Sequence, residues 1–308
     1  MLTRETFVGP WAGLPVAWSD HDEFDEQTYR ADIARCCEAG VPGIYTSGTT
    51  GEFYAMEFDE FKTVTRAAIE EARAHGVAAM VGCTSTYTLG AVRRAAVAAE
   101  LGADAVQLAL PFWMEIGDGQ IVPFFEEVAA AAEGLAISIY ETKRAKKVLT
   151  LEQHRAIKEA VPRYLMVKSN RGTIASAPHG CSLVSQFINV FVGENRWQEL
   201  CPAGAVGCCS SYVYWNPGLI LSAWEHVRQK DWQGLEVAMR PFDELGEFMN
   251  AQFDPKGYTD TAYDRLGGIA GGFIKASLRC RGPYPSVSEE DVRTLRRWCE
   301  QNFPQMLH

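Results

Sequence analysis

One lysine in this sequence stands where its amine could act as a nucleophile. Lys168 directly follows residues 164–167, a short apolar run with the composition of a strand that is buried on both faces. Burial disfavours a charged ammonium and lowers the pKa of an amine, and a neutral amine can attack a ketone. Of the nine lysines only Lys275 competes, and a helical lysine beside apolar residues more often extends to solvent. The structural alternative for Lys168 is a salt bridge at the end of its strand.

Two further segments offer groups that such an amine would need. Tyr140 ends the apolar run 136–139 and precedes Lys168 by one strand–helix unit, so the two should end neighbouring strands. Its phenol could relay protons, although a tyrosine in this position is more often a core residue with a satisfied hydroxyl. The segment Gly48-Thr49-Thr50-Gly51 offers two hydroxyls and backbone N–H groups, which together can hold a carboxylate.

These residues are carried by a pattern of short apolar runs that alternate with longer amphipathic stretches. Such a pattern predicts a parallel sheet with helices between its strands. The runs recur at nearly even spacing, at residues 43–46, 78–81, 105–110, 136–140, 165–168 and 190–193. Residues 14–18 are the candidate first strand and residues 205–209 the candidate eighth, which predicts a (β/α)₈ TIM barrel. The rival doubly wound sheet is disfavoured because no Gly-x-Gly-x-x-Gly follows the first strand.

The end of the chain has a different pattern. After residue 230 only helices are predicted, over residues 232–249, 259–278 and 288–301. We therefore expect residues 1–230 to form the barrel and residues 231–308 a C-terminal helical domain. Because active sites of such barrels lie at the carboxyl ends of the strands, the barrel should carry the site.

Composition and charge narrow the class of protein. The chain has 308 residues, of which 47% are hydrophobic and 22% charged, as is typical of a globular protein with a large core. Its 39 acidic and 29 basic residues give a formal charge of −10, which disfavours binding to nucleic acid or to anionic membranes. The start has no apolar signal region and no stretch suits a membrane span, so we expect a cytoplasmic protein.

Cysteine and histidine spacing gives no sign of a metal site. The nine cysteines include two adjacent pairs and no Cys-x-x-Cys, which argues against a disulfide framework and against a zinc ribbon. The six histidines show no His-x-His or His-Glu-x-x-His spacing, so no metal is expected. His21 and His154 are interpreted as solvated residues of a loop or helix.

Taken together, these motifs resemble those of the dihydrodipicolinate synthase / N-acetylneuraminate lyase family of class I Schiff-base aldolases and hydro-lyases. The resemblance runs from about residue 8 to the C-terminal segment. It is carried by Gly48-Thr-Thr-Gly-Glu52, Pro111-Phe-Trp113, Tyr140, Lys168, Gly193-Glu194 and Gly204-Ala-Val-Gly207. It implies a barrel with a C-terminal helical domain, commonly a homotetramer built as a dimer of dimers.

The resemblance also implies a role for each matching residue. Lys168 would form a Schiff base with pyruvate or another 2-oxo acid, and no cofactor beyond this covalent imine is expected. Tyr140 would relay protons to and from the imine, with Thr49 as the relay hydroxyl. Thr50 and Gly48 would hold the carboxylate of the 2-oxo acid. The other expected substrate contacts are Trp113, Arg144, Gly193, Glu194, Cys209 and Ser210.

Two departures from the family fall on residues that select the second substrate. The lysine-pathway synthases have Tyr-Asn-x-Pro-x-Arg, whereas this chain has Tyr140-Glu-Thr-Lys-Arg-Ala145, with Ala145 in the place of the arginine. Arg144, Lys143 or Lys146 could instead contact a distal carboxylate. Trp113 replaces a relay tyrosine of those synthases, and an indole N–H donates but cannot pass a proton on.

We therefore predict a class I lyase that catalyses aldol cleavage, aldol condensation or dehydration of a pyruvate-derived 2-oxo acid. The departures argue against aspartate semialdehyde as the partner. The Trp113 loop is similar to that of hydratase-aldolases acting on arylidene pyruvates, and sugar-acid aldolases and dehydratases stay open. One alternative is authentic 4-hydroxy-tetrahydrodipicolinate synthase, with the basic loop replacing the missing arginine. An alternative of another class is a catalytically silent paralogue that binds a 2-oxo acid as a sensor or scaffold.

Overall fold

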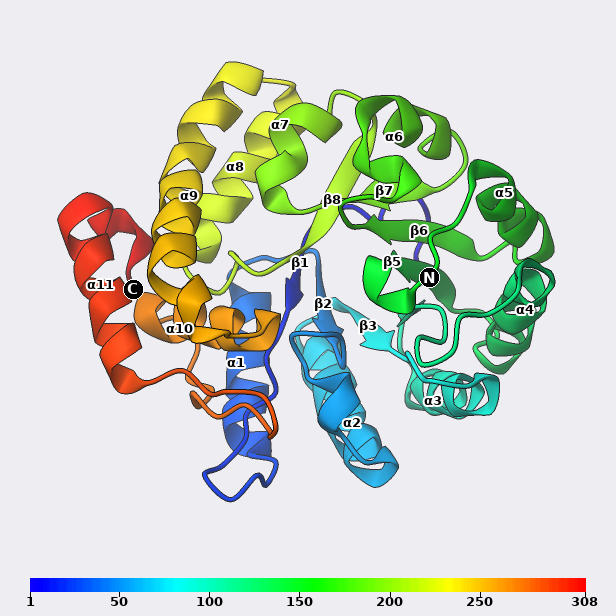
Figure 1. Cartoon of the computed structure of the whole chain (residues 1–308), viewed down its shortest axis with the longest axis horizontal. Helices are drawn as coiled ribbons and strands as arrows, with labels where there is room; N and C mark the ends of the chain where they lie inside the picture. Colours follow the sequence, from blue (N-terminus) through cyan, green and yellow to red (C-terminus); the bar gives the residue numbers. More distant parts are fainter. The chain divides into compact units, whose positions relative to one another are not determined.

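A computed structural model describes residues 1–308, and its eight strands form a closed barrel in the order β1 to β8 (Figure 1). The strand pairs whose register is described are all parallel. The predicted (β/α)₈ barrel is therefore confirmed. The strands are β1 (Gly9–Gly13), β2 (Gly43–Thr46), β3 (Ala78–Gly82), β4 (Ala105–Leu108), β5 (Ala136–Glu141), β6 (Tyr164–Ser169), β7 (Asn189–Phe191) and β8 (Ala205–Ser210).

Helices follow each strand and also complete the chain after β8, as predicted. The α-helices are α1 (Glu26–Glu38), α2 (Phe58–Ala74), α3 (Thr88–Leu101), α4 (Ile121–Ala131), α5 (Leu151–Ala160), α6 (Pro178–Val184), α7 (Trp197–Leu200), α8 (Pro217–Gln229), α9 (Trp232–Phe253), α10 (Asp260–Gly271) and α11 (Glu289–Asn302). The 3₁₀ helices are η1 (Phe53–Ala55), η2 (Asp118–Gln120), η3 (Lys143–Ala145), η4 (Ile174–Ser176), η5 (Glu194–Arg196), η6 (Asp254–Lys256) and η7 (Pro304–Met306). None of these helices combines the length and the apolar character that crossing a bilayer would require.

The position of the first strand was wrong in the sequence-based prediction. The structure places β1 at Gly9–Gly13, where every residue is buried, instead of at residues 14–18. Its register with β2 pairs Ala12 with Ile44. Pro15 interrupts the predicted strand, and proline has no N–H to continue a ladder of hydrogen bonds.

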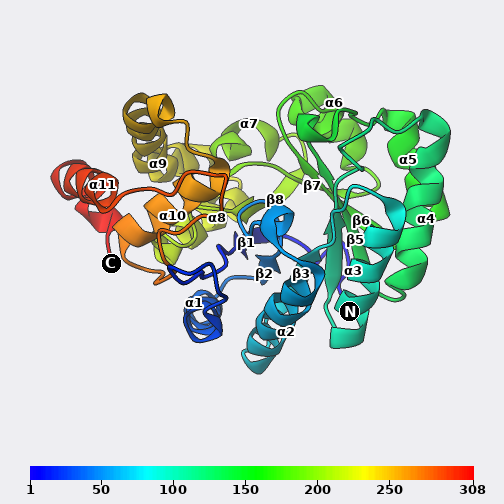
Figure 2. The ribbon, with the colours of Figure 1, turned by 60° about the horizontal axis from the view of Figure 1, so that its bottom comes forward.

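Contacts divide the chain into two compact units. One comprises Met1–Gly9 and Ala78–Cys209, and the other comprises Pro10–Val77 and Ser210–His308. These units do not coincide with the predicted division into residues 1–230 and 231–308. In the first unit, Figures 1 and 2 show α4 and α5 side by side outside β5 and β6. The strands of this unit are almost entirely buried, as the apolar runs of the sequence predicted.

In the second unit the chain ends in four helices. The predicted helix over residues 259–278 is shorter, because Gly272 takes a left-handed φ of +87° and ends α10. Helix α11 begins with a capping box in which Ser288 and Asp291 cap each other's backbone. Burial raises the pKa of Asp291, but hydrogen bonds from Lys256, Tyr258 and Ser288 outweigh it and lower the pKa to about 2.

Candidate active site

Lys168 and Tyr140 come together on neighbouring strands. The register of β5 and β6 pairs Tyr140 directly with Lys168. The Nζ atom of Lys168 lies 4.4 Å from the centroid of the Tyr140 ring, whose negative face attracts a cation. Both side chains are half-buried, whereas the residues on either side of each are buried. The structure thus places the predicted amine and phenol at one level of the barrel.

An amide that the sequence analysis missed holds the phenol. Asn170 lies two residues after Lys168, and its Nδ2 donates to the Tyr140 hydroxyl at 2.9 Å. The backbone N–H of Asn170 also donates to the carbonyl oxygen of Glu141 at 3.1 Å, which fixes the start of the loop after β6. Because the amide fills an acceptor position on the phenol oxygen, the phenol keeps its own proton to donate. The only signal in the sequence was a polar residue just beyond a strand end.

Polar and sulfur atoms lie inside the barrel on the strands of the same unit. Gln107 on β4 donates through Nε2 to Ser138 Oγ at 3.0 Å and lies 4.0 Å from Cys209 Sγ. The Oε1 atom of Gln107 is buried and has no hydrogen-bond partner. Burial raises the pKa of the Cys209 thiol, which outweighs the opposite effect of the nearby Lys168 charge. Cys209 therefore lies within electrostatic reach of Lys168 as a neutral thiol.

The loop after β5 carries the basic residues that replace the family pattern. Lys146 Nζ donates to the carbonyl oxygen of Trp113 at 2.6 Å, and Lys147 Nζ pairs with Asp118 at 2.8 Å. These two lysines fasten the loop to the segment after β4. Arg144 is exposed, and Ala145 is buried.

A buried polar group supports this loop from the outer side of β5. The interpretation of His154 as a solvated residue was wrong, because its side chain is fully buried. Its Nε2 lies 3.4 Å from Glu141 Oε2, and its Nδ1 lies 2.8 Å from the Tyr164 hydroxyl. Glu141 Oε1 also accepts a hydrogen bond from the backbone N–H of Leu149 at 2.7 Å. Glu141 thus joins the two ends of the loop, next to Tyr140 along the strand.

The other residues predicted in this unit have different environments. The Trp113 side chain is 73% exposed, so the structure shows it as a surface residue. Glu194 is buried at the start of η5, and its charge contributes to raising the pKa of Cys209. Gly193 precedes it and is exposed.

In the second unit, the segment after β2 is held tightly. A Cβ atom on Gly48 would lie 2.4 Å from the Tyr45 ring, so only glycine fits there. Thr261 on α10 donates to the carbonyl oxygen of Thr49 at 2.8 Å. Thr50 Oγ1 donates to Asp264 Oδ2 at 2.6 Å, which commits its hydroxyl proton to that carboxylate. The Ser210 hydroxyl accepts from a backbone N–H at 3.1 Å and is buried.

Glu52 anchors the end of the same segment. Its carboxylate is fully buried and accepts hydrogen bonds from Trp18 Nε1 at 2.7 Å and from Arg265 Nη2 at 2.6 Å. The backbone N–H of Arg281 donates to the other oxygen at 2.9 Å. A buried carboxylate with a buried guanidinium partner and further donors is a structural group that fixes the backbone.

The fold and the site together define a class: a closed (β/α)₈ barrel with C-terminal helices, in which a lysine and a tyrosine end neighbouring strands. Comparison with known proteins gives the family. The model of the dihydrodipicolinate synthetase family matches residues 7–262. The chain belongs to this family, as the resemblance predicted.

Similar proteins of the family differ in their named activities. A probable 5-dehydro-4-deoxyglucarate dehydratase of Streptomyces coelicolor is 33% identical over 137 residues, 44% of this chain and 42% of that protein. A trans-O-hydroxybenzylidenepyruvate hydratase-aldolase of Pseudomonas putida is 27% identical over 153 residues, 47% of this chain and 46% of that protein. The matched stretches thus span less than half the length of these relatives.

The fold is shared with solved structures at lower sequence identity. A prophage protein of the dihydrodipicolinic acid synthase family from E. coli K12, in complex with pyruvate, superposes with a TM-score of 0.86. It is 18% identical, and the match covers 96% of this chain and 98% of that one. At this identity the likeness concerns the fold.

Proposed function

We propose that this protein is a class I lyase in which Lys168 forms a Schiff base with pyruvate or another 2-oxo acid. The observation that carries the proposal is the Lys168 amine 4.4 Å from the Tyr140 ring, on paired positions of β5 and β6. Membership of the dihydrodipicolinate synthetase family supports it, since relatives are named as a dehydratase and a hydratase-aldolase. No cofactor is needed, because the imine itself is the electron sink.

The chemistry follows from an amine beside a phenol. Lys168 Nζ adds to C2 of the 2-oxo acid, and the former carbonyl oxygen leaves as water after taking one proton from the amine and one from Tyr140. The product is a protonated imine, which withdraws electrons from C3. Loss of a proton or of a carbon substituent from C3 then gives an enamine. Asn170 keeps the phenol oxygen in place during these transfers.

The residues after β5 favour a dehydratase or aldolase over the lysine-pathway synthase. Ala145, which stands where those synthases have an arginine, is buried, and Lys146 is held by the carbonyl oxygen of Trp113. Neither supplies the contact that aspartate semialdehyde would need at this position. The reaction we propose is therefore aldol cleavage, aldol condensation or dehydration of a pyruvate-derived 2-oxo acid. The roles of Thr49 and Thr50 stay predictions, which substitution of each can test.

We also propose that the protein acts in the cytoplasm as a homotetramer, a dimer of dimers. Trp113 and Met114 are each 73% exposed on adjacent positions, and large apolar side chains in such a patch favour contact with another chain. Nine cysteines without disulfide-like spacing suit a reducing compartment. Light scattering tests the assembly, and a monomeric mass would contradict it.

Borohydride reduction in the presence of pyruvate tests the proposed chemistry. We expect a covalent mass increment on the peptide that contains Lys168, and its loss in Lys168→Ala. Lys62→Ala, an exposed lysine on α2, is the matched control and should keep the increment. A folded wild-type protein without the increment would refute the imine.

A second measurement distinguishes an active enzyme from a catalytically silent paralogue. An imine enzyme should exchange the C3 protons of pyruvate with deuterium from the solvent, even without a second substrate. A protein that only binds a 2-oxo acid should show no exchange. Imine trapping without exchange would therefore favour the sensor or scaffold.

A further inference from the structure

We infer that Asp264 and Thr261 on α10 are positioning residues for the carboxylate of the 2-oxo acid. Both act through the segment of residues 48–52, which is expected to hold that carboxylate and belongs to the same compact unit as α10. The inference rests on the proposed function, because it concerns the binding of the same 2-oxo acid. It assigns part of the substrate affinity to a helix that follows the eight strands.

Three side chains on one face of α10 bond to this segment. The Thr261 hydroxyl donates to the carbonyl oxygen of Thr49 at 2.8 Å. One turn further along the helix, Asp264 Oδ2 accepts from the Thr50 hydroxyl at 2.6 Å. The adjacent Arg265 donates at 2.6 Å to the buried carboxylate that ends the segment. Because residues three and four apart share a face of a helix, a single face of α10 fixes most of the segment.

Helix α10 is itself packed closely on another side. A Cβ atom on Gly267 would lie 2.2 Å from Trp215 Nε1, and one on Gly271 would lie 3.0 Å from the Trp215 carbonyl oxygen. The two glycines thus let the segment after β8 lie directly against the helix backbone. Arg265, on the same helix, is fully buried. A helix that is packed in this way holds its side chains more precisely than a loop would.

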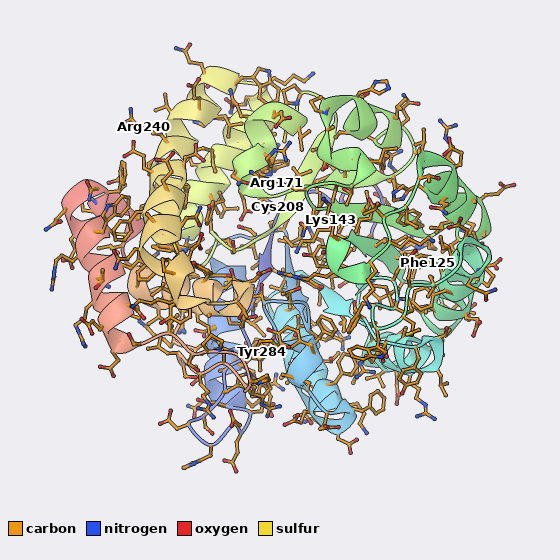
Figure 3. The ribbon with its side chains drawn as sticks, in the orientation of Figure 1. Phe125, Lys143, Arg171, Cys208, Arg240 and Tyr284 are labelled. Atoms are coloured by element: carbon orange, nitrogen blue, oxygen red, sulfur yellow. The ribbon has the colours of Figure 1, made fainter.

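A pair of tyrosines extends the contact beyond the segment. The Tyr54 hydroxyl in η1 lies 3.1 Å from Thr261 Oγ1. Because Thr261 gives its own proton to a carbonyl oxygen, it accepts from the Tyr54 hydroxyl. Tyr284, which Figure 3 labels on the segment between α10 and α11, packs edge-to-face on the Tyr54 ring with 4.9 Å between the centroids. The residues directly after position 52 are therefore held from the same side.

The groups that α10 positions are backbone N–H donors. The N–H groups of Thr49, Thr50 and Gly51 donate to no acceptor in the chain, whereas those at positions 52 and 53 close the turn at 3.0 and 3.2 Å. Consecutive N–H groups of this kind bind a carboxylate. The Thr50 hydroxyl gives its proton to Asp264, so the backbone of the segment carries the binding. Asp264 thus sets the orientation of the N–H groups without contacting the substrate.

Substitution of Asp264 tests the inference through the affinity for pyruvate. Asp264→Ala deletes the acceptor, whereas Asp264→Asn keeps an oxygen that accepts from the Thr50 hydroxyl. The measurements are the pyruvate concentration that gives half-maximal borohydride trapping on Lys168, and the rate of C3 proton exchange per imine at saturation. We expect Asp264→Ala to raise this concentration at least threefold and Asp264→Asn to stay within twofold of the wild type. The exchange rate per imine should stay unchanged in both variants.

Three further variants separate positioning from a general loss of structure. In a Thr50→Val background, Asp264→Ala should have no further effect, because its partner is already absent. Thr261→Val removes the other bond from α10 and should raise the concentration at least twofold, so it tests the inference even where Asp264→Ala does not fold. Asp254→Ala is the matched control and should leave the concentration unchanged, since it removes an exposed carboxylate that accepts from the Tyr263 hydroxyl of the same helix.

The outcomes are distinct from those of the proposed function. An unchanged or lower concentration in folded Asp264→Ala would overturn the inference, since the carboxylate would then only compete for the Thr50 proton; an unchanged concentration in Thr261→Val would overturn it as well. An equal rise in Asp264→Asn would show that the charge matters instead of the bond, and a lower exchange rate per imine would place Asp264 in the chemistry. Either result contradicts positioning. Failure of the wild type to trap pyruvate would instead refute the proposed function.

Discussion

Removing the Asn170 amide should slow proton transfer without preventing the imine. Asn170→Ala deletes the 2.9 Å hydrogen bond to the Tyr140 hydroxyl and leaves Lys168 unchanged. A hydrogen bond of this kind contributes about 0.5 to 1.5 kcal/mol, which corresponds to a roughly 2- to 13-fold fall in rate. The assay is the exchange of the C3 protons of pyruvate for deuterium, divided by the amount of imine that borohydride traps. We expect the exchange rate per imine to fall, while trapping at saturating pyruvate is retained.

Two further variants show whether the amide acts as a donor. Asn170→Asp has the same shape but only accepts, so it should be at least as slow as Asn170→Ala. Asn302→Ala removes an amide from α11 that donates to the carbonyl oxygen of Trp298, and it should leave the exchange rate unchanged. Full exchange in Asn170→Asp would refute the reasoning, since shape alone would then be sufficient. An unchanged rate in Asn170→Ala would refute it as well.

Three other predictions follow from buried, crowded or charged positions. His154→Ala removes a buried side chain beside Glu141 and should lower the free energy of unfolding in urea by about 2 to 4 kcal/mol. The control His21→Ala changes an exposed residue and should alter this free energy by less than about 0.5 kcal/mol. Equal effects of the two substitutions would contradict the buried network. Gly48→Ala places a Cβ atom 2.4 Å from an aromatic ring and should cost about 1 to 3 kcal/mol, while Gly119→Ala, with no atom within 4 Å of the added Cβ, should be close to neutral. The Asp291 carboxylate, with a pKa lowered to about 2, should stabilise the fold fully above the unfolded pKa of about 4 and lose this contribution as the pH falls toward 2. The difference in stability between wild type and Asp291→Asn should therefore be constant near neutral pH and shrink in acid, and a constant difference down to pH 2 would contradict the assignment.

The strands that are buried on both faces were the part of the fold that the sequence predicted best. Their apolar runs stand out from the amphipathic helices, and the spacing of Tyr140 and Lys168 placed the two on neighbouring strands, as the register confirms. The first strand was missed because Gly9–Gly13 contains glycine and proline, which are poor strand formers. The following residues 14–18 have more strand-like side chains, but they form a buried irregular segment.

Other features could not be predicted because they depend on contacts between distant elements. His154 lies among polar residues on its helix, which is typical of a solvated position. In the fold it is buried, with its Nδ1 bonded to the Tyr164 hydroxyl and its Nε2 3.4 Å from Glu141 Oε2. Asn170 belongs to no motif. Its significance comes from the Tyr140 hydroxyl that β5 places opposite it, and a single sequence does not give the orientation of side chains across a loop.

The Glu141 carboxylate has a consequence for how this active site can change. It closes the loop at Leu149 and leaves residues 142–148 as a short insert between fixed ends. Tyr140 is outside this insert, on the inner face of the strand. Exchange of this insert, by natural selection or by engineering, can therefore alter the choice of substrate while the amine and the phenol stay in place, but it also replaces the bonds from Lys146 and Lys147 to the segment after β4. The residues that select the substrate can then change while the residues that form the imine stay the same.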